Sequence, residues 1–163
     1  MAEVYLGLGS NKGDRLDNLR RAVSLLPPAM EVKKVSSVYE TTPMYMEDQD
    51  YFFNVALGGE TSLTPFDLFT HAKDIERQLG RIDSVPNGPR ELDIDILLFN
   101  DLILSTPELT IPHPRMHERA FVLVPLEEIA RRVVHPVFGK EIIELWDDIG
   151  GSAGRVFELR ELV

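Results

Sequence analysis

The sequence predicts an α+β fold, a ferredoxin-like sandwich in which helices flank a mainly antiparallel sheet. The expected elements follow one another as strand, helix, strand, strand, helix, strand, which is the order of that fold. The second and third strands, residues 32–41 and 51–61, are separated by nine residues. Because so short a connection cannot contain the helix of a parallel crossover, these two strands are expected to pair antiparallel.

The first half of the chain begins with a short apolar strand over residues 4–9. Asp14 is placed to cap the helix that follows, and Pro27-Pro28 ends it. The apolar face of this helix is expected to contain residues at helical spacing: Leu16, Leu19, Val23 and Leu26. The strands at 32–41 and 51–61 come next.

Thr64-Pro65 predicts a second helix, because a capping threonine is followed by proline at the first helical position. Gly80 marks its end. Its buried stripe is predicted from five apolar residues: Phe66, Phe69, Ala72, Ile75 and Leu79. Residues 81–87 lack periodicity and predict a loop.

The segment 88–99 predicts a buried strand, the last of the core elements. Asn100-Asp101 is expected to turn this strand into a hairpin with residues 102–104. Residues 119–130 are predicted to be helical. The stretch after Val133 gives no clear pattern.

Composition narrows the function classes. A length of 163 residues with 44% hydrophobic residues suits one domain with a substantial core. A net charge of -10 argues against a nucleic-acid partner, and no window approaches the roughly 20 apolar residues of a membrane span. The absence of cysteine excludes disulfides and thiolate chemistry. With no secretory signal visible, a cytoplasmic location is expected. The chain is also expected to be a monomer.

Two aspartates lie within the predicted strand at 88–99. Because side chains alternate in a strand, Asp93 and Asp95 are expected to share one face, with their Cα atoms roughly 7 Å apart, while Leu92, Ile94 and Ile96 enter the core. Paired carboxylates suit Mg²⁺, which also collects phosphate oxygens. From these residues alone, a solvated strand face fits equally well. Arg90 and the Pro-, His- and Arg-rich segment 110–119 favour a phosphoryl-transfer site.

Four blocks of sequence give a more specific signal. They are Leu8-Gly9-Ser10-Asn11 with Gly13-Asp14, the segment 36–41, the segment 88–99, and the segment from Ile111-Pro112-His113 to Phe121. Together they resemble the 6-hydroxymethyl-7,8-dihydropterin pyrophosphokinase family of folate biosynthesis. The resemblance extends from residue 4 to about residue 130, with the blocks in the correct order.

This resemblance implies that residues 1–163 form a single pyrophosphokinase domain. The implied reaction transfers pyrophosphate from ATP to 6-hydroxymethyl-7,8-dihydropterin and leaves AMP and the pterin pyrophosphate. Two Mg²⁺ ions are expected between Asp93, Asp95 and the ATP phosphates, where they would neutralise charge and help to align an in-line attack. No covalent nucleophile is needed for such a reaction.

The resemblance also implies roles for individual residues. The catalytic set is Arg81, Arg90, Asp93, Asp95, His113 and Arg119. The ATP-binding set is Lys73, Glu76, Arg90, Ile96, Thr110, His113 and Arg119. The pterin-binding set is Thr41, Thr42, Met44, Phe52, Asn54 and Phe121. From spacing alone, Lys73 and Glu76 also fit an ordinary surface pair, and Phe52 and Phe121 fit core positions.

The chain departs from the better-known family members in the loop after Arg81. Asp83 and Asn87 stand where a second arginine and a tryptophan are usual, and Glu108 and Pro114 replace other nucleotide-contacting side chains. These differences suggest an altered lid. They motivate an alternative, a catalytically weakened ligand-binding domain of the same fold. A metal-dependent phosphohydrolase is a second alternative, although no residue stands out to activate water.

Overall fold

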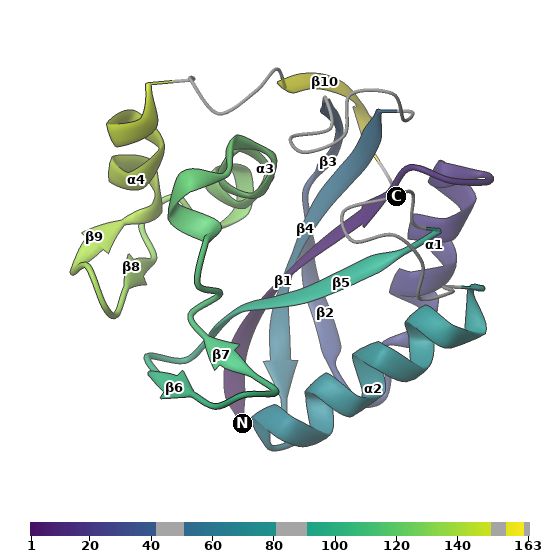
Figure 1. Ribbon diagram of the computed structural model, residues 1–163, viewed down its shortest axis with the longest axis horizontal. Helices are drawn as coiled ribbons and strands as arrows, with labels where there is room; N and C mark the ends of the chain where they lie inside the picture. The colour runs from purple at the N-terminus through teal and green to yellow at the C-terminus, as the bar shows by residue number, and fades with distance from the viewer. Residues whose placement is uncertain (42–50, 81–90, 151–155, 162–163) are drawn as a thin grey trace.

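A computed structural model describes residues 1–41, 51–80, 91–150 and 156–161, the last segment as backbone only (Figure 1). The core elements are β1 (Ala2–Ser10), α1 (Arg15–Leu25), β2 (Glu31–Val35), β3 (Ser37–Thr41), β4 (Phe52–Thr61), α2 (Pro65–Gln78) and β5 (Asp93–Phe99). The later elements are β6 (Leu104–Ser105), β7 (Thr110–Ile111), a 3₁₀ turn (Met116–Glu118), α3 (Ala120–Ala130), β8 (Val134–His135), β9 (Lys140–Glu141), α4 (Ile142–Ile149) and β10 (Val156–Glu161).

The central sheet has the strand order β10-β3-β4-β1-β5, and β2 also pairs with β4. All of these pairs are antiparallel. If β2 and β3 are taken as the single second strand that the sequence predicts, the core order is fourth, first, third, second, which is the ferredoxin-like arrangement. The predicted fold class is therefore confirmed.

The predicted strand at 32–41 is divided at Ser36. The Ser36 N–H donates to the Ala56 carbonyl at 2.9 Å, and the Ser36 Oγ accepts the Ala56 N–H at 2.8 Å. A serine side chain thus replaces one backbone acceptor of the ladder, so the chain bends between β2 and β3 while both strands stay paired to β4.

The two faces of the sheet are covered differently (Figure 1). Helices α1 and α2 cover one face, where Leu6 and Leu57 belong to a buried apolar core with Leu19 of α1 and Ile75 of α2. On the other face α3 packs on the sheet and α4 packs against α3, and Tyr5 and Leu97 join a second core with Leu123 and Leu145. Strand alternation assigns neighbouring residues to opposite faces, so β1, β4 and β5 each contribute to both cores.

Both predicted helix starts are confirmed. The Asp14 Oδ1 accepts the Asp17 N–H at 3.1 Å, and the Thr64 Oγ1 accepts the Asp67 N–H at 3.2 Å. The second helix ends at Gln78 with Leu79 as its C-cap, and the predicted Gly80 follows with a φ of +91°, which is costly for any residue with a Cβ.

The buried stripe predicted for this second helix is partly wrong. Phe66 is 43% exposed, whereas Leu68 is fully buried. The stripe that faces the sheet is Leu68, Ala72, Ile75 and Leu79. Phe66 lies two residues, or about 200° of helical rotation, from Leu68, and so falls on the far side of the helix.

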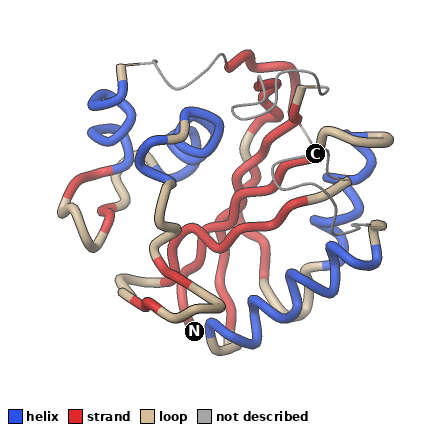
Figure 2. Tube along the Cα trace, viewed as in Figure 1, coloured by secondary structure: helices blue, strands red, loops and turns tan. Residues whose placement is uncertain are grey.

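The hairpin predicted at Asn100-Asp101 is also wrong. The chain does turn there, with Asn100 at φ 48°, but residues 102–104 do not pair with β5. Instead, β6 pairs with β7, and β8 pairs with β9, as two small separate ladders (Figure 2). The Asn100 N–H bonds to the Glu3 carbonyl at 2.7 Å, which ties the turn to the start of β1.

The helix predicted at residues 119–130 is confirmed as α3, with Arg119 as its N-cap residue. The stretch after Val133, which gives no clear sequence pattern, contains α4 and the strand β10 that extends the sheet beside β3. Among the described residues, no helix has the length and apolar character needed to cross a bilayer.

Candidate active site

The two aspartates of β5 lie side by side on the face of the sheet that α3 partly covers. Ile94 and Ile96, on the opposite face, are 2% and 4% exposed, while Asp93 and Asp95 remain half-buried. Asp93 pairs across the sheet with Gly9, and Asp95 pairs with Gly7. Because directly opposite residues share a face, the neighbouring strand presents no side chain beside either carboxylate. The predicted alternation is confirmed.

The row that contains Asp93 continues across the sheet to Asn54. Gly9 pairs with Asp93 on one side and with Asn54 on the other. A Cβ at position 9 would lie 2.9 Å from the Asn54 Oδ1 and 3.4 Å from the Phe52 Cδ1. The side chains of Asn54 and Phe52 therefore lean over the glycine. This packing requires glycine at position 9. It also places the predicted pterin-binding residues on the same face of the sheet as the predicted metal-binding residues, one strand away from Gly9 on either side.

Thr41 fixes the orientation of the Asn54 amide. The Asn54 Nδ2 donates to the Thr41 Oγ1 at 2.6 Å, and the two residues are 5% and 2% exposed. With the amide nitrogen held by Thr41, the Asn54 oxygen is directed toward Gly9. The amide edge is thus oriented before any ligand binds, which reduces the ordering cost of recognition.

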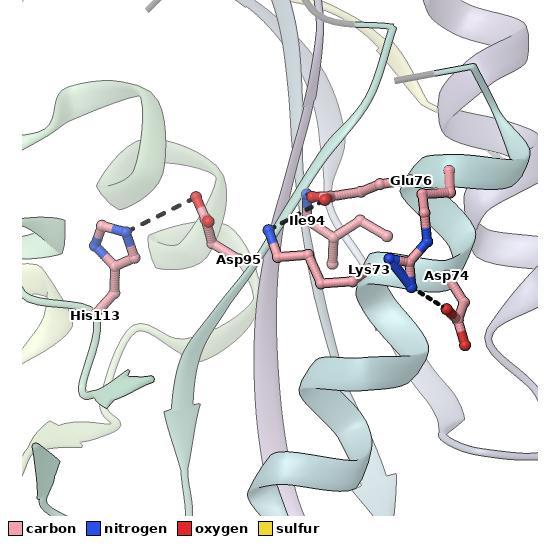
Figure 3. Close-up of polar contacts among 7 residues, drawn as sticks. Lys73, Asp74, Glu76, Ile94, Asp95 and His113 are labelled. Carbon is pink, nitrogen blue, oxygen red and sulfur yellow. Dashed lines mark hydrogen bonds and ion pairs between the residues drawn. The ribbon is translucent and has the colours of Figure 1, made fainter. Parts of the chain in front are cut away.

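His113 follows β7 and is held against β5 by its own backbone, whose N–H donates to the Leu97 carbonyl at 3.0 Å. Its Nε2 lies 3.9 Å from the Asp95 Oδ2, too far for a hydrogen bond (Figure 3). Burial, and then the positive charges of Arg119 and Arg115, lower the pKa of His113 to about 4. The ring is therefore neutral near pH 7. Its Nδ1 accepts the Arg115 N–H at 3.3 Å, which leaves the proton on the Nε2 that faces Asp95.

Arg119 and Phe121 lie at the start of α3. The Arg119 guanidinium carbon is 5.5 Å from the centroid of the Phe121 ring, close enough for a cation–π contact. Phe121 is only partly buried, although it packs against the second core. Its ring is therefore not a fully enclosed core residue.

A pocket extends from Asp95 and His113 along the outer side of β5. Its lining comes from α2, β5, the β6–β7 connection and the segment after β7: Phe69, Ile94, Asp95, Ile96, Pro107, Glu108, Leu109, Thr110, His113 and Pro114. The structure thus brings together Ile96, Thr110 and His113, which the resemblance assigns to ATP. It also adds Phe69, Pro107 and Leu109 to the candidate site. The sequence does not single these three residues out, because apolar side chains that line a pocket look the same in a sequence as those that fill a core.

Lys73 and Glu76 lie on α2 behind β5 and form an ion pair, with the Lys73 Nζ 3.1 Å from the Glu76 Oε1. Glu76 is 2% exposed, and its Oε2 accepts the Ile94 N–H at 2.8 Å (Figure 3). The pair is therefore more than an ordinary surface pair. One carboxylate oxygen is bound to the strand that carries the aspartates.

Several site residues assigned from the resemblance lie outside the described residues. These are Thr42, Met44, Arg81 and Arg90, together with the two departures Asp83 and Asn87. Within the part of the chain that the structure describes, no three or more His, Asp or Glu side chains are grouped closely enough to hold a metal ion. A cation at Asp93 and Asp95 therefore needs further oxygen ligands, from a substrate or from water.

Comparison with known proteins gives close relatives. Residues 5–131 match the family model described as 7,8-dihydro-6-hydroxymethylpterin-pyrophosphokinase (HPPK). The chain is 53% identical over 132 residues to the 2-amino-4-hydroxy-6-hydroxymethyldihydropteridine pyrophosphokinase of Bacillus subtilis, which covers 80% of this chain and 79% of that protein. It is 43% identical over 144 residues to the protein of the same name from Aquifex aeolicus, which covers 88% and 90%.

Solved structures give the same fold. A crystal structure of an HPPK-DHPS in complex with substrates superposes with a TM-score of 0.74 over 93% of this chain, at 18% identity. The match covers 44% of that longer chain. At this identity, the likeness supports the fold, and the two closer sequence relatives support the family.

Proposed function

This chain belongs to the 7,8-dihydro-6-hydroxymethylpterin-pyrophosphokinase (HPPK) family, and from that premise we propose which of its residues bind the substrates and carry the reaction. The enzyme transfers pyrophosphate from ATP to 6-hydroxymethyl-7,8-dihydropterin in folate synthesis. The pterin hydroxyl oxygen bonds to the β-phosphorus, the bridging oxygen leaves with AMP, and the hydroxyl proton is released. The protein contributes alignment and charge stabilisation.

In this proposal, Asp93 and Asp95 would hold two Mg²⁺ ions, and ATP would supply further oxygen ligands. The proposal is supported by a hard oxygen donor set, by the shared face of the carboxylates, and by the glycines Gly7 and Gly9, which place no β1 side chain opposite them. When bound, the cations neutralise phosphate charge and favour in-line displacement. Asp93 and Asp95 orient those cations, because their strand is fixed by β1 on one side and by α2 on the other.

In this proposal, His113 and Arg119 bind the phosphates on the side of the pocket opposite α2. A neutral His113 donates a hydrogen bond from its Nε2–H to a phosphate oxygen. The Nε2 therefore acts as a donor beside Asp95, whose oxygens can only accept. Arg119 supplies a planar fork of donors for two phosphate oxygens. Arg81 and Arg90 are proposed to add positive charge from the segment outside the described residues.

The pterin is proposed to lie over Gly9, with its amide edge on Asn54 and its ring between Phe52 and Phe121. Thr41, Thr42 and Met44 complete that edge. The row Asn54–Gly9–Asp93 carries this proposal. Two interstrand spacings separate its ends, about 10 Å, a span that a flat bicyclic ligand and its hydroxymethyl arm can bridge. The alcohol then points at the metal carboxylates.

The nucleotide is proposed to occupy the pocket beside β5, with its base between Phe69, Ile96 and Thr110 and its phosphates toward Asp95 and His113. Lys73 and Glu76 flank it from α2. We further propose that residues 1–163 form one pyrophosphokinase domain that acts as a monomer in the cytoplasm.

Product analysis tests this assignment. The purified protein is incubated with ATP, Mg²⁺ and 6-hydroxymethyl-7,8-dihydropterin, and the products are separated by anion exchange. We expect AMP and pterin pyrophosphate in equal amounts, and we expect both to disappear when the pterin is omitted. Inorganic phosphate without a pterin product would instead indicate a phosphohydrolase. Pterin binding without turnover would indicate a catalytically weakened ligand-binding domain.

A further inference from the structure

We infer that Glu76 is a positioning residue, which sets the geometry of the two metal-binding aspartates by holding the backbone between them. The inference rests on the proposed role of Asp93 and Asp95. It assigns Glu76 an action on the protein's own strand, from behind the site. Figure 3 shows the Glu76 carboxylate reaching from α2 to Ile94, with Asp95 beyond it on the same strand.

The first reason is the place of β5 in the sheet. Among the described strands, β5 pairs only with β1, so its other edge has no strand to accept its outward N–H groups. A buried N–H without an acceptor is strongly unfavourable. The Glu76 Oε2 accepts the Ile94 N–H at 2.8 Å in a buried setting. One side-chain oxygen of α2 thus takes the place of a missing neighbouring strand.

The second reason is the charge of the group that makes this bond. Glu76 is 2% exposed, and burial of a carboxylate is unfavourable unless the charge is compensated. The Lys73 Nζ lies 3.1 Å from the Glu76 Oε1 and 5.3 Å from the centroid of the Phe69 ring. The Lys73 ammonium group is therefore held by the Glu76 carboxylate and by the Phe69 ring. A buried, compensated carboxylate makes a stronger bond to an N–H than a neutral acceptor does.

The third reason is the position of the bond in the chain. The Ile94 N–H belongs to the peptide unit that joins Asp93 to Ile94, so its direction fixes the backbone on both sides of that unit. Asp93 is the first residue of β5, where an edge strand would otherwise fray. Holding this peptide therefore keeps both aspartates on one face and at a constant separation.

Three variants separate this role from the alternatives. Glu76→Met removes the acceptor and keeps the length of the side chain. Glu76→Asp keeps the charge but withdraws the carboxylate from Ile94 by about one C–C bond. Glu76→Gln keeps an oxygen that can still accept the Ile94 N–H. Asp74→Asn is the matched control, since it removes an exposed ion pair with Arg77 from the same helix.

Two measurements do not depend on turnover. The first is the hydrogen-exchange rate of the Ile94 amide in the metal-free protein, followed by NMR. The second is the binding of Mn²⁺, followed by electron paramagnetic resonance, with α,β-methylene-ATP present. The kcat and the KM for ATP are also measured, to show which of the two changes together with the affinity for Mn²⁺.

For Glu76→Met and Glu76→Asp, we expect faster Ile94 exchange and Mn²⁺ binding weaker by about 10–100-fold, the usual cost of losing an outer partner of a metal ligand. The value of kcat should fall more than the KM for ATP rises. Glu76→Gln should keep most of both properties, and Asp74→Asn should match the wild type. If Glu76→Met does not fold, the Asp and Gln variants still make the comparison.

Two outcomes would overturn the inference. In the first, the Asp variant leaves Ile94 exchange and Mn²⁺ binding unchanged but raises the KM for ATP, which would make Glu76 a direct nucleotide ligand. In the second, the Gln variant loses Mn²⁺ binding while Ile94 stays protected, which would make charge alone responsible. Asp95→Asn is included because unchanged Mn²⁺ binding in that variant would refute the metal site itself, separately from the role of Glu76.

Discussion

The Asn54 side-chain amide donates to the Thr41 hydroxyl oxygen at 2.6 Å, and both groups are buried on the sheet face that carries Asp93. The bond crosses from β4 to β3 and fixes which end of the amide faces the cleft. Pterin recognition should therefore depend on a residue that need not touch the ring through its side chain.

Replacement of Thr41 by valine should weaken pterin binding. Valine keeps the shape but offers no acceptor, so the Asn54 amide loses the bond that orients it. A lost hydrogen bond of this kind costs about 1–1.5 kcal/mol, or roughly tenfold in affinity. Thr41→Ser should retain most of the affinity. Isothermal titration with the pterin distinguishes these outcomes, and equal affinities for the two variants would contradict the orienting role.

Replacement of Gly9 by alanine should impair pterin binding more than metal binding. Its Cβ would lie 2.9 Å from the Asn54 Oδ1, so the amide or the strand must shift. Gly7→Ala is the comparison, because its Cβ would lie 3.4 Å from the Leu97 side chain. We expect pterin affinity to fall at least tenfold more in the first variant, since overpacking costs about 1–3 kcal/mol. A wild-type pterin affinity for Gly9→Ala would argue against binding over this strand.

Removal of either metal carboxylate should stop turnover without unfolding the protein. We expect Asp93→Ala and Asp95→Ala each to lower kcat by at least about a hundredfold, as loss of a charge-stabilising group typically does. Both side chains are half-exposed, so the melting temperature should change little. Asp101→Ala, in the exposed turn after β5, is the control. Retained activity in both single variants would refute the metal assignment.

The β8–β9 hairpin should lose stability in acid. Burial, and then the charge of His117, lower the pKa of His135 below its ordinary value of 6.5. The His135 Nδ1 accepts the Val137 N–H at 3.2 Å and the Phe138 N–H at 3.4 Å, and a proton on that nitrogen would remove both bonds.

Below pH 6.5, the unfolded chain therefore binds more protons at His135 than the folded protein does. The stabilising contribution is complete above pH 6.5 and is lost as the pH falls toward the lowered pKa. Urea titrations across this range should show a steeper acid loss for the wild type than for His135→Gln. Parallel pH profiles for the two proteins would exclude the effect.

Local signals in the sequence were sufficient wherever the structure depends on local chemistry. Thr64, Pro65 and Gly80 set the bounds of α2 because capping and a positive φ act within a few residues. The alternation of Asp93 and Ile94 gave the two faces of β5 for the same reason. The order of the core elements then fixed the fold class.

The failures involve partners that lie far away in sequence. Asn100 favours a turn, but the turn residue does not encode which strand receives the returning chain, and its bonds go to Glu3 of β1. The bond from Glu76 to Ile94 joins a helix to a strand across a loop, so spacing alone suggested only a surface pair with Lys73. Phe69 resembled a core residue because a cleft wall and a core share the same chemistry.

The two-faced character of β5 has an evolutionary consequence. Adjacent positions along this one strand have different surroundings: Ile94 and Ile96 are buried, whereas Asp93 and Asp95 lie half-buried on the face where the metal site is proposed. A saturation library over residues 93–96 should therefore yield fitness scores that alternate in kind, with inactive but abundant protein at the odd positions and scarce protein at the even ones. Substitutions at the odd positions can therefore change the activity of the protein during evolution while the fold is kept.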